Sequence, residues 1–314
     1  MIKLIKLIKI KLIKLLNKIF KKYFDKKILL LSSTHILKVR PLYKNVKKIT
    51  EVEFKAFSQN GEDGIIDYLL HSLKIEKPTF VEVGVGDYSE CNTRLLYERT
   101  ACRGLIVDCL DNLEAKVSKN IKLWKGDLSV VEIFVNSENI LGILNKHKFN
   151  TNIDLFSLDI DGIDYWVLKK LPSDFSKIVI TEFNGVFGSD LEITVPNLDK
   201  FNRSDYHYSH LCFGASLKAI INLMIKKNFI FLGANLSSCN AFFVSKKYIN
   251  EINLDLPDIS DIAEYVNSYI RESRSNDGNL SYLSGKDRIK EIENCEVIDL
   301  KKSEERKNII KNLI

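Results

Sequence analysis

Short apolar runs alternate with amphipathic stretches from residue 57 onward, and this alternation is the main structural signal in the chain. Apolar, β-rich runs that end in polar residues or glycine predict strands within 79–87, 104–110, 121–129, 153–162 and 176–185. Apolar residues at helical spacing predict helices within 57–73, 89–100, 112–120, 135–149 and 165–172. Because the two types alternate, we expect a parallel sheet with helices on both faces.

The region after the fifth predicted strand completes the sheet. An irregular stretch covers 185–211, a helix is predicted over 214–228, and 229–248 reads as two strands joined by a polar turn. The expected fold class is therefore α/β: a Rossmann-like, doubly wound, mainly parallel sheet closed by an antiparallel C-terminal hairpin, with a basic N-terminal helix. We divide the chain into a basic amphipathic extension (1–50), the sheet domain (51–250) and a helical, charged tail (251–314).

The first 24 residues have a pattern of their own. Lysines stand at positions 3, 6, 9, 11, 14, 18, 21 and 22, and most of them fall opposite an apolar helix face. Lysine interrupts the apolar run every two or three residues, which argues against a signal peptide or a membrane span. Such a helix can lie in the interface of an anionic membrane. The alternatives are an extension without a fixed partner, or one that binds nucleic acid or a partner helix. Residues 28–50 are expected to form a connector.

Charge separates this extension from the rest of the chain. Residues 1–50 contain 15 Lys or Arg and one Asp, whereas residues 51–314 contain 32 basic and 40 acidic residues. A mildly acidic body is a poor general nucleic-acid binder, so we expect no nucleic-acid partner. The six cysteines form no C-x-x-C pair, which suggests a reducing compartment. We expect a cytoplasmic location, with peripheral attachment to the inner face of the membrane as an open alternative.

Ligands of open α/β sheets bind beyond the carboxyl ends of the strands, so polar residues there are the candidates for chemistry. The first strand ends in Glu82, followed by Gly84, Gly86 and Asp87. Two glycines at a strand-to-helix turn let the backbone approach a ligand. The flanking carboxylates disfavour a pyrophosphate and favour a cationic or zwitterionic ligand, and S-adenosyl-L-methionine has that charge. A plain tight turn is the alternative.

Single carboxylates are expected to end the second and third strands. Asp108 lies 22 residues after Gly86, where a carboxylate can accept hydrogen bonds from both ribose hydroxyls of an adenosine. Capping of the next helix is the alternative role for Asp108. Asp127 is expected to end the third strand, close to the adenine.

Three carboxylates, Asp159, Asp161 and Asp164, follow the fourth strand, and they repel one another unless a cation, a positively charged ligand or raised pKa values offset the repulsion. Their spacing is not that of an EF-hand loop. We place Asp159 at the cofactor and assign no metal ligands, although a divalent ion held by two of them stays a less favoured alternative. Glu182 and Asn184 end the fifth strand, and Asn184 is a candidate for a contact with the acceptor substrate. Asp161 or Glu182 is the expected general base toward an acceptor hydroxyl, with helix capping and loop bracing as alternatives.

Two polar segments are expected near the same edge of the sheet. Ser58–Asp63 precedes the first strand and is too polar for the core. The loop 206–210 contains two of the five histidines, and His207 and His210 are candidates for a contact with the acceptor substrate or for a base. A solvent-exposed loop is the alternative.

Seven motifs occur in one order within residues 54–248: FSQNGEDGII, TFVEVGVGDYSECNT, GLIVDC, LFSLDIDGIDYWVL, VITEFN, FGASLKAI and GANLSSCNAFFV. As a set they resemble FkbM-like proteins, which are related to class I S-adenosylmethionine-dependent methyltransferases and are often met near surface-polysaccharide genes. The resemblance implies that 51–250 is a methyltransferase-like domain. It also implies that Glu82, Gly84 and Gly86 line the methionine end of the donor, Asp108 the ribose, and Asp161 with Glu182 the reactive centre.

The expected function is transfer of a methyl group from S-adenosylmethionine to a hydroxyl, on a sugar of a surface glycan or on a related metabolite. Catalysis would come chiefly from placing donor and acceptor in line. Two other readings stay open. One is a non-catalytic protein that binds a nucleotide ligand or acts as a scaffold on the same fold. The other is a metal-dependent enzyme that uses the aspartates of 159–164.

Overall fold

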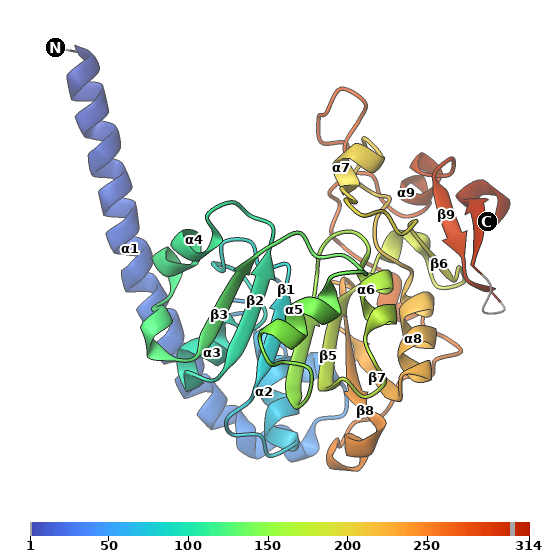
Figure 1. Ribbon diagram of the computed structural model, residues 1–314, viewed down its shortest axis with the longest axis horizontal. Helices are drawn as coiled ribbons and strands as arrows, with labels where there is room; N and C mark the ends of the chain where they lie inside the picture. Colours follow the sequence, from blue (N-terminus) through green and yellow to red (C-terminus); the bar gives the residue numbers. More distant parts are fainter. Residues whose placement is uncertain (1, 302–304) are drawn as a thin grey trace.

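A seven-stranded sheet forms the centre of the molecule, in the strand order β3-β2-β1-β4-β5-β8-β7 (Figure 1). The computed structural model describes residues 2–301 and 305–314. The strands of this sheet are β1 (Phe80–Val83), β2 (Gly104–Asp108), β3 (Leu128–Glu132), β4 (Ile153–Leu158), β5 (Ser176–Glu182), β7 (Phe229–Ala234) and β8 (Asn240–Ser245). β8 runs antiparallel to both of its neighbours, and the pairs from β3 to β5 are parallel. The predicted fold class is therefore confirmed.

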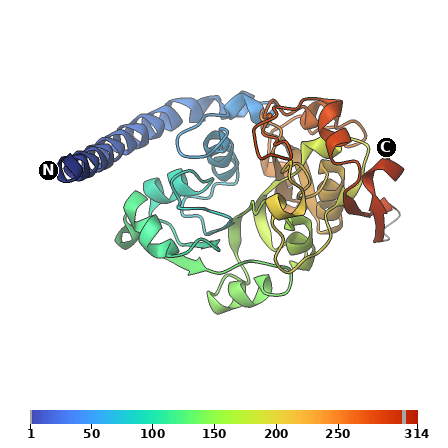
Figure 2. The ribbon, with the colours of Figure 1, turned by 90° about the horizontal axis from the view of Figure 1, so that it is seen from above.

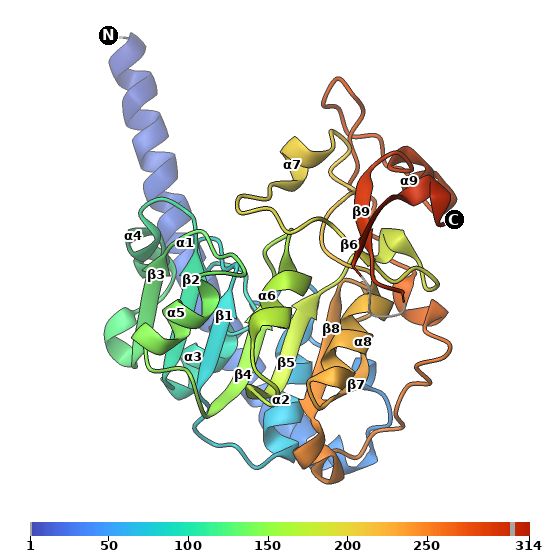
Figure 3. The same ribbon diagram turned by 45° about the vertical axis from the view of Figure 1, so that its right-hand side comes forward.

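Helices cover both faces of this sheet. The α-helices of the described residues are α1 (Ile2–Val39), α2 (Glu62–Ser72), α3 (Arg94–Thr100), α4 (Leu113–Asn120), α5 (Ile140–Lys146), α6 (Asp164–Lys170), α7 (Arg203–Tyr206), α8 (Leu217–Lys226) and α9 (Lys286–Glu291). Of these, α7 and α9 lie near the C-terminal segment and not on a face of the sheet (Figure 3). Alternate residues of each strand enter two separate apolar cores. Val81 and Val83 pack with α5, α6 and α8, whereas Phe80 packs with α2, α3 and α4. This division is what a doubly wound sheet requires, because successive side chains of a strand point to opposite faces.

The basic end of the chain folds as one long helix, α1, which continues through the predicted connector to Val39. Its second half is fixed to the domain. Arg94 donates to Asp25 at 2.7 Å, and Arg40, just after the helix, donates to Asp67 at 2.7 Å. Its first half extends beyond the sheet (Figures 1 and 2). Within residues 2–301 and 305–314, no helix combines the length and the apolar character that a membrane crossing needs.

The C-terminal segment differs from the predicted helical tail. Its strands β9 (Glu296–Asp299) and β10 (Arg306–Ile309) form a second, antiparallel sheet with β6 (Ile193–Thr194), at the end of the molecule away from α1 (Figure 3). The prediction of a helical tail is wrong because these strands are held by partners far away in the sequence, which local periodicity does not report. The division at residues 50 and 250 stays a prediction.

The third strand lies later than predicted. Leu123–Lys125 forms a short 3-10 helix, η3, and the strand itself is Leu128–Glu132. Asp127 therefore precedes the strand instead of ending it. Glu132 ends the strand, where it accepts a hydrogen bond from the amide of Leu113 at 3.1 Å.

Candidate functional site

The loop after β1 lines a cavity of about 500 Å³ at the carboxyl edge of the sheet. Gly84 has φ +86°, and a Cβ there would lie 1.6 Å from the carbonyl oxygen of Asp159. Gly86 has φ +52°, and a Cβ there would meet nothing within 4 Å. The first glycine thus allows the loops after β1 and β4 to touch. The second keeps backbone accessible to a ligand in the cavity.

Asp108, at the end of β2, ties this loop in place. Its Oδ2 accepts a hydrogen bond from the amide of Gly86 at 2.7 Å, and its Oδ1 accepts one from the amide of Leu110 at 2.8 Å. The residue also lines the cavity. Each carboxylate oxygen has two lone pairs, so Asp108 can accept from the hydroxyl groups of a ligand as well.

The cavity is acidic and partly apolar. Five carboxylate residues line it: Asp87, Glu90, Asp108, Asp159 and Asp161. None of the described residues that line it is basic. Apolar side chains join them from the segment after β3 and from the loop before α7: Ile133, Phe134, Val135 and Phe201. Such a lining disfavours phosphate groups and suits a ligand with a flat apolar part and a cationic part.

Two of the predicted cofactor residues lie outside this cavity. Glu82 follows the alternation of β1 to the face that holds Phe80, where it is 3% exposed. It accepts from the amides of Asn92 and Thr93, each at 2.9 Å, and burial raises its pKa to about 7. Glu82 therefore braces the segment that leads into α3.

Asp127 lies at the opposite edge of the sheet. Its side chain is 74% exposed and stands 3.5 Å from Nε of Arg103. The predicted place near the adenine is wrong, because the residue comes before β3 and the ligand edge is at the other end of that strand. Asp159, Gly84, Gly86 and Asp108 do line the cavity.

Three carboxylates from two strand ends converge beside the cavity. One oxygen each of Asp159, Asp161 and Glu182 lies within 4.8 Å of the others. Burial, followed by the charges of Asp161 and Asp164, raises the pKa of Asp159 well above its usual range. Burial and the charge of Asp159 raise the pKa of Glu182 in the same way. Two carboxyl groups this close, with pKa values raised by burial and by each other's charge, favour a proton on one of them.

The second oxygen of Glu182 is an exception among the buried polar atoms. Its Oε2 has no hydrogen-bond partner in the part of the chain that the structure describes. An unpaired buried carboxylate oxygen is unfavourable by about 1–3 kcal/mol or more. An orphaned acceptor of this kind is expected where a ligand supplies the missing donor or cation.

The other two aspartates of the loop after β4 have separate partners. Arg203 donates to Asp161 at 2.7 Å and to Glu272 at 3.2 Å. Asp164 accepts from two backbone amides of its own loop, both at 3.0 Å, and burial raises its pKa to about 6. Asp161 thus faces the cleft beside a guanidinium, whereas Asp164 holds the loop in shape.

A second cavity of about 190 Å³ adjoins the first. Gln59, Asp159 and Asp161 line both. The remaining polar lining of the second cavity comes from the end of β5, from α7 and the loop after it, from the β7–β8 turn and from the C-terminal segment: Glu182, Asn184, Arg203, His210, Ser238, Cys239, Ser268, Glu272 and Arg288. The carboxylate cluster therefore stands between two spaces, and only the smaller one contains arginine.

The predicted substrate residues take different positions around the second cavity. Asn184 and His210 line it, but the side-chain amide of Asn184 donates to two carbonyls of the 211–213 loop at 2.8 and 2.9 Å and braces that loop. His207 is not among the lining residues. Its ring bonds Ser209 Oγ at 2.7 Å and packs on Tyr208, and burial lowers its pKa.

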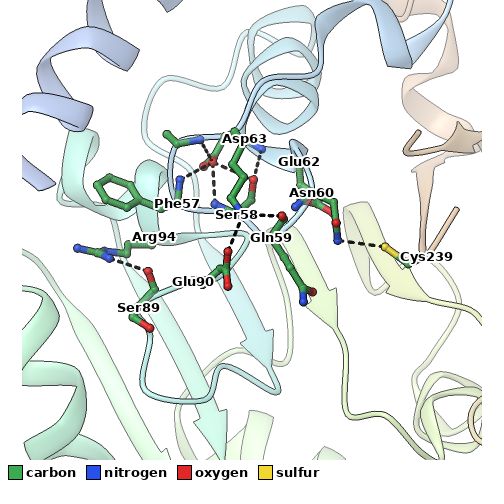
Figure 4. Close-up of polar contacts among 12 residues, drawn as sticks. Phe57, Ser58, Gln59, Asn60, Glu62, Asp63, Ser89, Glu90, Arg94 and Cys239 are labelled. Atoms are coloured by element: carbon green, nitrogen blue, oxygen red, sulfur yellow. Dashed lines mark hydrogen bonds and ion pairs between the residues drawn. The ribbon is translucent and has the colours of Figure 1, made fainter. Parts of the chain in front are cut away.

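The polar segment 58–63 leads into α2 and is held by a network of hydrogen bonds (Figure 4). Asp63 accepts from the amides of Phe57 and Ser58, each at 2.7 Å. Glu62 is buried and accepts from the side-chain amides of Asn235 at 2.7 Å and Asn240 at 2.8 Å, which fixes the loop to the β7–β8 hairpin.

The side chain of Gln59 points away from this network (Figure 4) and lines both cavities. Its amide has no hydrogen bond within the described residues and is free for a ligand. Sequence reasoning singled out the loop by its polarity but did not separate Gln59 from its neighbours. It also missed Arg203 and Arg288, for which no local signal exists.

No model of a protein family matches the chain, and no curated protein matches it in sequence. Solved structures that are similar to it include S-adenosylmethionine-dependent methyltransferases. One from Clostridium acetobutylicum aligns at 10% identity with a TM-score of 0.39, over 59% of this chain and 90% of that one. The pyocyanin biosynthetic protein PhzM aligns at 15% identity with a TM-score of 0.32, over 54% of this chain and 50% of that one. An O-methyltransferase family protein from Burkholderia thailandensis aligns at 11% identity with a TM-score of 0.35, over 59% and 57%.

This chain spans 50% and 57% of the second and third of these structures. TM-scores this low carry no argument about acceptor or mechanism, which must come from the site itself. The FkbM-like resemblance stays a prediction.

Proposed function

We propose that this protein is an S-adenosylmethionine-dependent methyltransferase that methylates a hydroxyl group, on a sugar of a surface glycan or on a related small metabolite. One observation carries the proposal: two adjoining cavities share a wall that contains Asp159 and Asp161. The larger cavity suits the methyl donor and the smaller one suits the acceptor. The carboxylate cluster then lies where the two ligands would meet.

The larger cavity fits the donor by its charge and by its shape. Asp108 would accept from the ribose hydroxyls, and the backbone at Gly84 and Gly86 would approach the methionine part. The carboxylates of the lining would attract its ammonium and sulfonium groups. The apolar residues after β3 would cover the adenine. When bound there, S-adenosylmethionine supplies the methyl group.

The chain itself would contribute placement and a proton acceptor. Holding two reactants in line is worth about 7–11 kcal/mol of the barrier in favourable cases. A carboxyl pair that shares one proton keeps one ionised carboxylate, and a raised pKa makes that carboxylate a better base for a hydroxyl proton. Glu182 lines the acceptor cavity with an unpaired oxygen, so we assign it the role of base. Asp161, held by Arg203, is the alternative base.

We also propose that residues 1–24 attach the protein to an anionic membrane surface, at the inner face of the membrane. In this part of α1 the exposed apolar side chains include Leu12, Ile13, Leu16 and Phe20. Removal of residues 1–24 keeps the contact between Asp25 and Arg94, which fixes α1 to the domain, and removes the hydrogen bond from Lys21 to Asn120. The truncated protein is expected to lose binding to anionic vesicles, and unchanged binding would refute this part. The acidic body supports our proposal that nucleic acid is not the partner.

Calorimetry with S-adenosylmethionine and S-adenosylhomocysteine on the full chain tests the donor site. Micromolar binding of both is expected, which corresponds to about −8 kcal/mol. Transfer of a labelled methyl group to a panel of sugars and hydroxylated metabolites then tests the reaction. Absence of binding contradicts the proposal. Binding without product on any acceptor favours a non-catalytic ligand-binding or scaffold protein on the same fold.

The orphaned Glu182 Oε2 favours a second candidate, a metal-dependent enzyme. Three carboxylate residues within 4.8 Å offer oxygen ligands of the kind that Mg²⁺ and Mn²⁺ prefer. A cation held by Asp159, Asp161 and Glu182 would relieve their repulsion and could orient an acceptor oxygen. Loss of activity with a chelator, and its return with Mg²⁺ or Mn²⁺, would support this candidate. Full activity in the chelator would exclude it.

A further inference from the structure

A groove of about 1170 Å³ is lined by residues of α1, of α4 and of the turn after α4. The two helices lie on the side of the molecule away from the C-terminal sheet (Figures 1 and 3). Seven lysines line the groove, three from α1 and four from α4 and the turn that follows: Lys21, Lys22, Lys26, Lys116, Lys119, Lys122 and Lys125. These lysines form two rows, one on α1 and one on α4 and the turn after it. Lys22 and Lys26 are four residues apart on α1, and Lys116 and Lys119 are three residues apart on α4, so each pair lies on one helix face.

The three acidic residues of the groove are already engaged. Asp25 binds Arg94 at 2.7 Å, and Glu98 stands 3.4 Å from Lys125. Asp87 accepts from the amide of Ser89 at 2.9 Å. The side-chain ammonium groups of four of these lysines have neither a hydrogen bond nor an ion pair with any residue that the structure describes: Lys22, Lys26, Lys116 and Lys119. The groove therefore has a surplus of positive charge that the protein itself does not neutralise.

The groove also has apolar surface and an aromatic residue beside it. Leu29, Leu110 and Ile121 line it between the two rows of lysines. Trp124, in the turn after α4, is 79% exposed, and Lys122 Nζ lies 5.3 Å from the centre of its ring. Exposed tryptophan together with lysines on apolar surface is typical of protein segments that sit at a membrane–water interface.

Two exposed aromatic residues, Phe20 and Phe24, lie on the other side of α1 at the same level: at 100° per residue they fall about 120–160° from Lys22 and Lys26. Tyr23 is exposed at the border of that face, and Lys27 Nζ lies 5.5 Å from the centre of its ring. Such a helix can bury its aromatic face in the interface while the lysines beside it reach the headgroups. The lysines of α4 and of the turn after it then lie next to the same membrane surface.

We propose that the groove between α1 and α4 holds the phosphate groups of anionic phospholipids, so that α4 and the turn after it form a second membrane contact beside residues 1–24. This inference rests on the proposed membrane attachment and adds that the folded body also touches the membrane. Asp87 lines both the groove and the donor cavity. The membrane contact would therefore adjoin the wall of the donor site.

Vesicle sedimentation of the full chain tests the groove. The vesicles contain phosphatidylcholine alone or mixed with phosphatidylserine. The groove variant combines Lys116→Gln, Lys119→Gln and Lys122→Gln. The matched control combines Lys146→Gln, Lys200→Gln and Lys290→Gln, which removes the same charge from exposed lysines away from the groove. Each lysine near an anionic surface contributes about a fivefold factor, so the groove variant should bind mixed vesicles on the order of a hundredfold more weakly. The control should bind within about twofold of the parent.

Tryptophan fluorescence reports the contact directly, because the chain has two tryptophans and Trp166 is buried. Mixed vesicles should shift the emission to shorter wavelength, and Trp124→Phe should abolish the shift. If the groove variant binds as well as the parent, the second contact is refuted while attachment through residues 1–24 stands. If the parent binds no anionic vesicle, both membrane proposals fail. If the parent prefers a DNA duplex or polyphosphate to vesicles and the groove variant loses that binding, the assignment to lipid is overturned.

Discussion

Asp108 offers the sharpest test of the donor site, because its carboxylate has two tasks. It lines the donor cavity, where it is expected to accept from ribose hydroxyls. It also holds the backbone amides of Gly86 and Leu110 at 2.7 and 2.8 Å. The substitution Asp108→Ala removes the acceptor for the ligand and the acceptors for the two backbone amides. Asp108→Asn keeps a single acceptor oxygen and replaces the second one by an amide group.

The size of the effect follows from these contacts. One lost ribose contact is worth about 1.4 kcal/mol, which is tenfold in the dissociation constant. Release of the Gly86 amide from a charged acceptor removes about 1.5–3 kcal/mol of local stabilisation, and part of this appears as a loop that must be ordered on binding. We therefore expect binding to weaken about 10- to 100-fold in Asp108→Ala, with Asp108→Asn between it and the parent.

Calorimetry with S-adenosylmethionine and S-adenosylhomocysteine measures these constants. The matched control is Asp127→Ala, which removes a carboxylate from the far edge of the same sheet, where the side chain is 74% exposed. It should leave both constants within about twofold of the parent value. Equal affinity of the parent and a folded Asp108→Ala protein would refute the assignment of the ribose site. Equal losses in both variants would show that net charge, and not position, governs binding.

Alanine at the two glycines of the loop after β1 should have different effects on stability. Gly84→Ala would place a Cβ 1.6 Å from the carbonyl oxygen of Asp159 and should prevent normal folding. Gly86→Ala should lower the free energy of unfolding, measured in urea, by only about 1 kcal/mol. Glu182→Gln should bind the donor within about twofold but transfer methyl groups about 100-fold or more slowly, as single-turnover rates would measure. Burial raises the pKa of Glu82 from 4.5 to about 7. The folded protein therefore holds that proton more tightly than the unfolded chain, and the unfolding free energy should fall as the pH rises between those two values. Urea titrations across this range should show a flatter dependence for Glu82→Gln, and an identical slope would contradict the buried position.

The fold was predictable because its signals are local. Each strand–helix unit from β1 to β5 shows in its own few residues the change from an apolar run to helical spacing, and the β7–β8 hairpin is marked by a polar turn. Asp108 was placed correctly for the same reason, since the strand that it ends is buried on both faces and has a clear apolar run. The donor side of the site is assembled from such units.

The error at β3 has a physical cause. This strand lies at the edge of the sheet and is only partly buried, so its apolar pattern is weak. The residues before it contain an apolar pattern that predicts a strand. Ile121 belongs to no strand, and it is apolar because it is buried at the end of α4. The face of the sheet to which Glu82 points, in contrast, could have been predicted from the sequence. Glu82 lies between Val81 and Val83, and a side chain between two core residues of a strand points to the other face.

The acceptor side could not be derived from local patterns, because segments far apart in the sequence build it. Arg203 comes from the insertion between β5 and α8, and Glu272 and Arg288 come from the C-terminal segment. The pairing of β6 with β9 and hydrogen bonds such as that from Arg203 to Glu272 bring the insertion and the tail together. On the proposed function, donor binding depends on the geometry of a sheet edge, whereas acceptor choice depends on two segments that no strand–helix unit constrains. It follows that changes within 185–211 and 268–288 should alter the accepted substrate and leave the affinity for the donor nearly unchanged.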